Sequence, residues 1–277
     1  MTQRYLNSGF DPSGLTDVFD ELPLWSAPFG LKLLDCVEYK QGISAIDIGC
    51  GTGFPLIELA MRLGDSSTVY GIDPWKDAIE KARRKIEYYG ITNIKLIEGV
   101  AESIPLKDNS IDLITSNNGI NNVQNIDTVL AECSRIAKQG GQFIQTMNTD
   151  KSMFEFYDLL ETIFSELGMT QEIEAMHQHI EAKRPPIDRI VTMLQKHGFF
   201  INDLEHDCFD YRFADGKAML HHHFIRLAFM DSWEKLMPEN KVDEVLCLAE
   251  SRMNEQAKQS GGFKLTIPYV MIYAKKR

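Results

Sequence analysis

The sequence predicts an α/β fold: a doubly wound, mostly parallel sheet with helices on both faces. Two observations indicate this fold. Residues 43–147 alternate short runs rich in β-branched side chains with longer segments of helical periodicity. The first run, Ile43–Ile48, is mostly apolar and leads into glycines, as expected for a parallel strand buried on both faces. Strand–helix–strand units of this length form right-handed crossovers and therefore parallel strands.

The elements of the first half follow in order along the chain. A helix over Phe54–Leu63 can hold Pro55 in its first turn, where the missing N–H costs nothing. A second helix, Asp77–Tyr89, is closed by Gly90. The other expected elements are the strands Thr68–Ile72, Ile94–Ile97, Ile111–Ser116 and Gln142–Met147 and the helix Ile126–Lys138.

In the second half the pattern changes to long helical segments between two late β-rich runs. Residues 171–183 are polar and receive no assignment, and the two prolines after Arg184 interrupt any helix. The run Phe199–Phe213 could hold a strand, and Phe263–Tyr273 is the expected last strand, which makes about seven strands with the last one antiparallel. The expected helices are Ser152–Leu167, Ile187–His197, His221–Met237 and Val242–Gln259.

The composition excludes some partners. The chain has 277 residues, of which 44% are hydrophobic and 25% charged, as in ordinary globular proteins. Its 29 basic and 40 acidic residues give a formal net charge of −11. A nucleic-acid or anionic-membrane partner requires a cationic surface, so we expect neither.

The sequence also favours a cytoplasmic location. No apolar run approaches the roughly 18 residues that cross a bilayer, and the N-terminus lacks the features of a signal peptide. The cysteines are odd in number, dispersed and never spaced as CxxC, which fits reduced thiols. We expect them to be buried and apolar rather than clustered for thiol chemistry such as arsenic methylation. They are Cys36, Cys50, Cys133, Cys208 and Cys247.

The motif that carries the chemistry is DIGCGTG, residues 47–53, where the first strand meets the first helix. In an open α/β sheet, ligands bind at this edge. A dinucleotide fingerprint requires glycine at its sixth position, but the sixth position counted from Gly49 is Phe54. Asp47 would repel a phosphate and suits a cationic ligand, whereas Asp73, at the end of the second strand, can accept both ribose hydroxyls. A nicotinamide-dependent oxidoreductase is therefore the weaker alternative.

Over residues 43–147 the chain resembles the class I S-adenosylmethionine-dependent methyltransferases, in particular their type 11 small-molecule group. Four stretches carry the resemblance, in the family's order and spacing: AIDIGCGTG, YGIDPW, GVAESIPLKDNSIDLITSNNGINNV and RIAKQGGQFI. The resemblance implies a Rossmann-like fold, S-adenosylmethionine as cofactor and S-adenosylhomocysteine as product. It also implies methyl transfer to a small-molecule acceptor by in-line displacement. A fold of this kind that binds the cofactor without turnover is the alternative.

The resemblance also implies roles for individual residues. Asp47 and the glycines would line the loop under the methionine moiety, and Asp73 would bind the ribose hydroxyls. Trp75 could pack on the adenine or ribose, and Asn117 would offer an oxygen to the methionine ammonium. The implied cofactor-binding residues are Asp47, Gly49, Cys50, Gly51, Gly53, Asp73, Pro74, Trp75, Ala101, Glu102 and Asn117.

The chain departs from the family pattern at two places. The family places an adenine-contacting pair at Ala101 and Glu102, but Val100 stands where the motif usually begins with an aspartate. Asn121-Asn122 replace a common His-His pair, which removes one candidate for acid–base work. No catalytic residue is assigned, because positioning and desolvation can supply most of the acceleration and a base is needed only for a protonated acceptor.

Other features have competing interpretations. The histidines at 177, 179 and 221–223 are expected to be solvated or helix-capping rather than metal ligands, although one of them could act as the acceptor's base. His206 and Asp210–Arg212 could project toward an acceptor pocket. The aromatic residues before the first strand could form a lid over the cofactor or pack on the sheet in the ordinary way. They are Tyr5, Phe10, Phe19 and Trp25.

These observations predict three parts. Residues 1–42 form a helical lid or cap, residues 43–150 bind the cofactor, and residues 151–277 complete the sheet. Helical insertions in the last part, at about 150–185 and 215–260, would form the acceptor pocket. We expect a small-molecule acceptor and a monomer or homodimer.

Overall fold

The computed structural model describes residues 25–277, and the predicted lid residues Tyr5, Phe10 and Phe19 lie outside this range. The chain divides into two compact units. We call the unit with described residues 25–149, 185–207 and 269–277 the core unit. The unit with described residues 150–184 and 208–268 is the insertion unit. The predicted three-part division stays a prediction.

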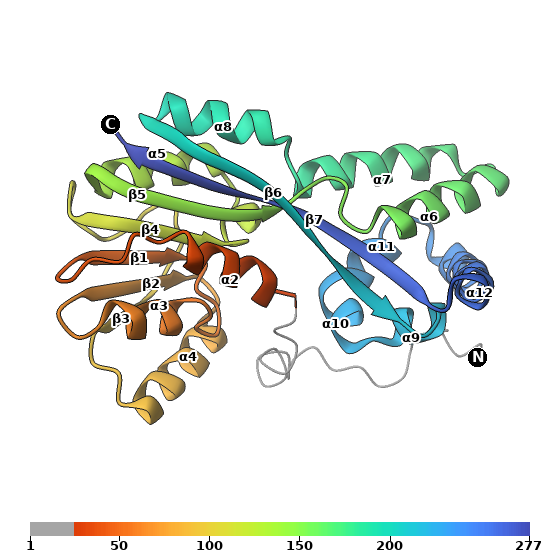
Figure 1. Cartoon of the computed structure of the whole chain (residues 1–277). Helices are drawn as coiled ribbons and strands as arrows, with labels where there is room; N and C mark the ends of the chain where they lie inside the picture. The colour runs from red at the N-terminus through yellow and green to blue at the C-terminus, as the bar shows by residue number, and fades with distance from the viewer. Residues whose placement is uncertain (1–24) are drawn as a thin grey trace. The chain divides into compact units, whose positions relative to one another are not determined.

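A seven-stranded sheet organises the fold, in the order β3-β2-β1-β4-β5-β7-β6 (Figure 1). Neighbouring strands from β3 through β5 are parallel, whereas β7 is antiparallel to β5. The predicted α/β sheet, mostly parallel with an antiparallel last strand, is therefore confirmed. The strands are β1 Ser44–Ile48, β2 Thr68–Asp73, β3 Ile94–Glu98, β4 Ile111–Asn117, β5 Ala137–Asn148, β6 Phe199–Phe213 and β7 Phe263–Lys276.

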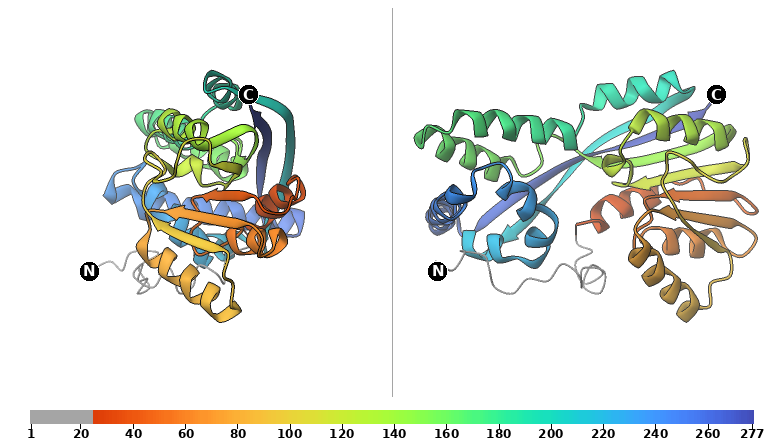
Figure 2. Two further views of the ribbon diagram at one scale, coloured as in Figure 1. Left: turned by 90° about the vertical axis from the view of Figure 1, so that its left-hand side faces the viewer. Right: turned by 180° about the vertical axis from the view of Figure 1, so that it is seen from behind.

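Helices cover both faces of the sheet in the core unit. Leu113 and Ile114 are successive residues of β4, yet they belong to different buried clusters, because neighbouring strand residues point to opposite faces. The cluster around Leu113 includes side chains of α2 and α3, and the cluster around Ile114 includes those of α5 and α8. The right-hand view of Figure 2 shows the side of the sheet opposite to that in Figure 1. The helices of this unit are α2 Ala27–Asp35, α3 Leu56–Leu63, α4 Lys76–Tyr89, η2 Ile120–Asn122, α5 Ile126–Ile136 and α8 Ile187–Lys196.

Trp25 and α2 belong to this packing. The Trp25 ring meets Phe29 edge-on with centroids 5.7 Å apart, and Phe29 is fully buried. Leu33 and Leu34 join the cluster that includes α3. Whether a lid precedes α2 stays a prediction.

The predicted boundary between helix Ile126–Lys138 and the fifth strand was wrong. The helix ends at Ile136, and β5 begins at Ala137, which pairs with Ile111 before a shift in register. Gly140 has a φ of 75°, which a residue with a Cβ rarely adopts. Gly140 and Gly141 therefore form an irregularity inside β5 and not a loop before it.

The insertion unit is mostly helical. Residues 171–183, which received no assignment, lie in α7, and the expected helix His221–Met237 is divided by a π-helical turn into shorter pieces. Methionines help to fill its interior, with Met219 and Met253 fully buried. The helices are α6 Phe154–Glu166, α7 Thr170–Lys183, α9 Gly216–His221, α10 His223–Ile225, η3 Arg226–Met230, α11 Asp231–Glu234, η4 Glu239–Lys241 and α12 Val242–Ser260.

Within residues 25–277, none of the helices combines the length and the apolar character that a bilayer crossing requires.

Candidate functional site

The glycine loop connects β1 to α3 at the point where the strand order reverses, since β2 and β4 flank β1 on opposite sides. The backbone N–H groups of Gly49 and Cys50 both donate to the carbonyl of Ile72, at 2.9 and 3.2 Å. Gly53 N–H donates to the carbonyl of Cys50 at 2.9 Å. The loop is therefore a tight turn attached to the end of β2, as expected for the ligand edge of such a sheet.

Two of the loop glycines serve different purposes. A Cβ on Gly49 would lie 2.7 Å from the Cα of Gly119, so this glycine allows two backbones to touch. A Cβ on Gly51 would meet no described residue within 4 Å, although its φ of 51° still favours glycine. Gly49 is thus needed by the fold, whereas Gly51 leaves open space above the loop.

Asp47 lies under this loop and is completely buried. Its Oδ1 accepts a hydrogen bond from Thr115 Oγ1 at 2.8 Å, but its Oδ2 has no partner among the described residues. Burial raises the pKa of Asp47 to about 7; the hydrogen bond from Thr115 opposes the rise, and the charge of Asp73 adds to it. A buried, half-paired carboxyl can accept a hydrogen bond from a cationic donor, which would restore its charged form.

Asp73 ends β2 and ties two segments together. Its Oδ2 accepts the N–H of Gly51 at 2.9 Å, and its Oδ1 accepts the N–H of Trp75 at 2.9 Å. Each carboxylate oxygen has a second lone pair for a further donor. The structure thus brings Asp47, the glycine loop and Asp73 together, as the sequence predicted, and adds the bond between Asp73 and Gly51.

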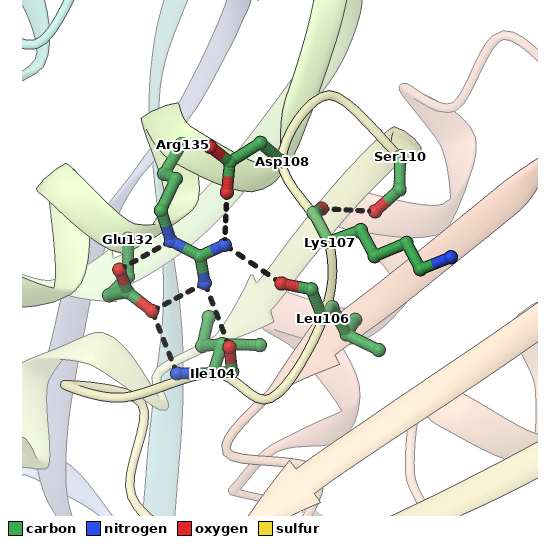
Figure 3. A network of polar contacts seen from close by, with 7 residues as sticks. All are labelled: Ile104, Leu106, Lys107, Asp108, Ser110, Glu132 and Arg135. Carbon is green, nitrogen blue, oxygen red and sulfur yellow. Dashed lines mark hydrogen bonds and ion pairs between the residues drawn. The ribbon is translucent and has the colours of Figure 1, made fainter.

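The loop after β3 is held by one arginine of α5 (Figure 3). Arg135 donates to the carbonyls of Ile104 and Leu106, each at 2.8 Å, and forms ion pairs with Asp108 and Glu132 at 2.7 Å. Glu132 also accepts the N–H of Ile104 at 2.8 Å. These contacts fix the segment that follows Ala101 and Glu102. Sequence reasoning missed this network, although the three-residue spacing of Glu132 and Arg135 on a helix was a signal for a pair.

Glu102 has a structural partner. Its Oε1 accepts the N–H groups of Gln124 and Asn125 at 3.0 and 3.2 Å, just before α5 begins. Ala101 is 6% exposed and joins the buried cluster that includes Ile104. One carboxylate oxygen of Glu102 is therefore occupied by the backbone of the segment before α5.

Asn117 is also engaged by the protein. Its Nδ2 donates to the carbonyl of Ser26 at 3.1 Å, and its Oδ1 accepts from Thr146 Oγ1 at 2.9 Å. The side chain thereby links the residue before α2 to β5. A ligand contact at this position would fall more readily to the backbone than to the amide group.

The structure also reveals an asparagine cluster: Asn118, Asn121 and Asn148. Asn118 Oδ1 accepts the backbone N–H of Asn148 at 3.0 Å and the Nδ2 of Asn121 at 2.9 Å, and Asn121 Nδ2 also donates to Asn148 Oδ1 at 3.1 Å. The backbone N–H fixes the orientation of the first amide, and that amide fixes the second. The donor Nδ2 of Asn118 and the acceptor Oδ1 of Asn121 are then buried without a partner among residues 25–277.

Sequence reasoning treated Asn121 only as a replacement for a histidine and did not find this cluster. The available signal was Asn118-Gly119, since Asn118 adopts a positive φ of 58° that asparagine tolerates better than most residues.

The cysteines only partly match the expectation. Cys50 and Cys133 are buried, and burial raises the pKa of the Cys50 thiol well above its ordinary value. The Cys50 side chain lies in the cluster that includes α3, so only its backbone faces the loop. The expectation of burial was wrong for Cys208 and Cys247, which are exposed. None of the five cysteines, which all lie within residues 25–277, forms a disulfide.

Some of these histidines and late polar residues have local partners. His177 pairs with Glu161 at 3.2 Å, and His221 Nδ1 lies 2.9 Å from the carbonyl of Lys217. Asp210 pairs with Arg212 at 2.9 Å. In the part of the chain that the structure describes, no three His, Cys, Asp or Glu side chains are grouped to hold a metal.

Residues 39–259 match a family model described as a methyltransferase domain. The chain belongs to the class I S-adenosylmethionine-dependent methyltransferases. It is therefore a methyltransferase, and its cofactor is S-adenosylmethionine. The resemblance inferred from the four motifs is confirmed.

Known relatives agree with this membership. The demethylmenaquinone methyltransferase of Geobacillus kaustophilus is 30% identical over 168 residues, which cover 58% of this chain and 72% of that protein. The structure of the YcgJ protein from Bacillus subtilis covers 91% of this chain and 99% of its own, with a TM-score of 0.60 and 17% identity. The geranyl diphosphate C-methyltransferase of Streptomyces coelicolor covers 98% of this methyltransferase and 87% of its own chain, with a TM-score of 0.57 and 14% identity. The last two share its fold.

Proposed function

We propose that the chain transfers a methyl group from S-adenosylmethionine to a small-molecule acceptor, at the carboxyl edge of the strands in the core unit. The observation that carries this proposal is the buried carboxyl of Asp47, whose Oδ2 has no partner among the described residues. It lies beneath a glycine loop whose middle residue, Gly51, faces open space. A cationic amine on the ligand would satisfy this carboxyl, so these residues fit the cofactor.

Each predicted site residue has a role in this proposal. Asp47 and the backbone of residues 49–53 hold the methionine end, and Asp73 accepts the ribose hydroxyls with its remaining lone pairs. Trp75 and Pro74 cover the ribose or adenine. Ala101 offers its backbone N–H and Glu102 its second oxygen to the adenine ring.

Asn117 acts through its backbone in this proposal, because its side-chain amide already binds Ser26 and Thr146. Cys50 likewise contributes only backbone.

When bound, the cofactor supplies an electrophilic methyl group on a sulfonium. The residues of this chain have to hold the acceptor's nucleophilic atom in line with that group and keep water away. The asparagine cluster is uncharged, and its unpaired donor and acceptor match a group that both donates and accepts, such as a hydroxyl or a carboxamide. We therefore propose a neutral, hydroxyl- or amide-bearing acceptor.

Demethylmenaquinone is the first acceptor to test, because relatives about 30% identical carry names that include it. Labelled methyl transfer would be followed with the oxidised and reduced compound, and with a metabolite extract as a wider acceptor source. A labelled product that disappears with Asn121→Leu would support the acceptor assignment. Transfer that is unaffected by this substitution would contradict it.

The cofactor site itself is tested by calorimetric titration with S-adenosylhomocysteine, with NAD as the parallel ligand. We expect micromolar binding of S-adenosylhomocysteine and none of NAD. Wild-type affinity for S-adenosylhomocysteine in a folded Gly51→Val variant would overturn the placement at the glycine loop.

A further inference from the structure

The insertion unit contains a buried cation without a counter-ion. Arg184 is the C-cap residue of α7 and is only 5% exposed. Its hydrogen bond, from Nη1 to the carbonyl of Ser152, is 3.5 Å long, at the limit for such bonds. No carboxylate of residues 25–277 forms an ion pair with it. Burying a charge without a partner costs free energy, so this position calls for an anion.

The guanidinium of Arg184 packs against aromatic side chains. Its guanidinium lies 5.7 Å from the centroid of the Tyr157 ring. Tyr157 is 4% exposed, and its hydroxyl accepts a hydrogen bond from Trp233 Nε1 at 3.0 Å. A ring face attracts the cation but uses none of its in-plane N–H donors. The guanidinium is thus held in place while most of its donors stay unused.

The unused donor groups include Nε and Nη2. Neither atom of Arg184 makes a hydrogen bond within residues 25–277. The Nε–H and one Nη2–H point the same way along one edge of a guanidinium. This edge matches the two oxygens of a carboxylate or phosphate.

Near Arg184, its own helix carries charges of both signs, with Glu181 three residues before Arg184. Lys183 precedes it, and His179 lies one turn earlier on α7. Burial lowers the pKa of His179, and the charges of Arg184 and Lys183 lower it further. On this helix Lys183 therefore favours an anionic partner of Arg184, whereas Glu181 opposes it.

We propose that Arg184 is an oxyanion-binding residue, whose Nε–Nη2 edge holds a carboxylate or phosphate group of a small-molecule ligand. The alternative hypothesis is that Arg184 has only a structural role, in stabilising the end of α7 and in binding the carbonyl of Ser152. The two hypotheses predict different effects of added anions on the NMR signal of Arg184 and on the unfolding midpoint. The proposal does not depend on the cofactor site.

The test uses the full chain in an anion-poor buffer, titrated separately with inorganic phosphate and with acetate. Arginine Nε–H signals are followed by NMR, with the Arg184 signal assigned by its loss in Arg184→Met. We expect that signal to shift with a millimolar dissociation constant. Arg184→Met should bind the anion at least about tenfold more weakly, because the charged guanidinium and its paired N–H donors are removed. Lys183→Met, which removes a charge one residue away, should change the affinity less than about twofold.

Thermal unfolding separates binding from a purely structural role. Anion binding should raise the wild-type midpoint and leave that of Arg184→Met unmoved. Without anions, Arg184→Met should unfold at the wild-type midpoint or higher, since it buries no unpaired charge. A lower midpoint together with no anion effect on the wild type would overturn the proposal. If Arg184→Met fails to fold, Arg184→Lys can replace it. Lysine keeps the positive charge but lacks the paired N–H donors, so this variant should also bind the anion more weakly than the wild type.

The source of the oxyanion follows from the two titrations. A shift with phosphate alone indicates a phosphorylated ligand, and a shift with acetate alone indicates a carboxylate. A shift of the Arg184 signal with neither would overturn the proposal. Calorimetry with S-adenosylhomocysteine on the same variants should give wild-type affinity, which distinguishes this proposal from that of the cofactor site.

Discussion

Asp47 and Thr115 share a single hydrogen bond, 2.8 Å long, in the middle of the sheet. The register of β1 and β4 places the two residues opposite each other. The bond satisfies Oδ1 only, so Oδ2 remains buried without a partner in the described chain. The pair therefore carries a cost of burial that a cation at Oδ2 would relieve.

We expect Asp47→Asn to stabilise the protein while weakening its binding of S-adenosylhomocysteine at least about tenfold. The pKa of Asp47 is raised from 3.8 to about 7 in the folded state, so folding retains a proton that the unfolded chain releases. The stability from this proton is complete below the unfolded pKa and is lost as the pH rises through about 7. The neutral amide avoids that loss. Its advantage should therefore grow toward about pH 8, to at most roughly 4 kcal/mol.

Urea unfolding at about pH 5 and about pH 8 checks this prediction, with calorimetry for the ligand. An equal effect of Asp47→Asn on unfolding at both pH values would contradict the assigned pKa. Thr115→Val serves as a control, because it removes the hydrogen bond but keeps the carboxylate.

Gly51→Ala should abolish binding of S-adenosylhomocysteine but leave the fold intact. Gly51 has a φ of 51° and open space beside its Cα, so the added methyl costs only the left-handed strain of roughly 1–2 kcal/mol. Gly90 closes α4 with a φ of 67° and also has nothing within 4 Å of a Cβ. Gly90→Ala should therefore show the same loss of stability with full ligand binding. Denaturation and calorimetry on both variants make the comparison, and equal affinities would place the ligand elsewhere.

Gly49→Ala should instead unfold the protein or prevent its folding. The new Cβ would lie 2.7 Å from the Cα of Gly119, and neither backbone segment can move without breaking the turn at the end of β1. Expression level and circular dichroism report the result. A stable Gly49→Ala variant would show that this contact is looser than the structure indicates.

Asp73→Ala should weaken binding of S-adenosylhomocysteine by about 1–3 kcal/mol, through lost charged hydrogen bonds. Part of that loss comes from the loop, since Asp73 also anchors Gly51 and Trp75. A 2′-deoxyribose analogue separates the two effects. The wild type should discriminate against it by calorimetry, whereas Asp73→Ala should not. If the wild type and Asp73→Ala discriminate equally against the analogue, Asp73 does not bind the ribose hydroxyls.

Arg135→Met should lower the free energy of unfolding by about 1–3 kcal/mol, because the loop after β3 loses its anchor and Glu132 loses its partner. Hydrogen bonding to Arg135 lowers the pKa of Glu132 below 4.5 in the folded state. That contribution is present above the unfolded pKa and is lost as the pH falls through the folded one. The difference between wild type and variant should therefore shrink below about pH 4. If the difference in the free energy of unfolding between wild type and Arg135→Met does not change with pH, the loss of stability comes from packing alone.

The central part of this fold was predictable because its signals are local. The alternation of strands and helices, the glycine loop and the acids at 47 and 73 lie in one stretch, and the parallel sheet brings them to one edge. The second half was harder to predict. The polar helix α7 buries one side chain, Met176, so it lacks the apolar periodicity that marks the other helices, and the helical pattern over residues 221–237 does not show the π-helical turn at Arg226–Met230.

The site was predicted in outline, but the partners of its side chains were not. That Glu102 binds the backbone before α5, and that Asn117 binds Ser26, depends on contacts between segments far apart in sequence. A motif gives the residue types at a position but not the groups that already occupy them. The asparagine cluster was missed for the same reason, since Asn148 belongs to a different strand from Asn118.

The place of β7 between β5 and β6 affects how the protein can be made. During synthesis, β1 to β5 emerge from the ribosome long before β7. The nascent chain can therefore assemble the parallel part of the sheet early. Until residues 269–275 emerge, however, the outer edge of β5 has no strand to pair with. An open edge is a template for pairing with other chains. Slow or interrupted synthesis of the late helices should therefore expose this protein to aggregation, and a chaperone that shields the edge of β5 would help it most.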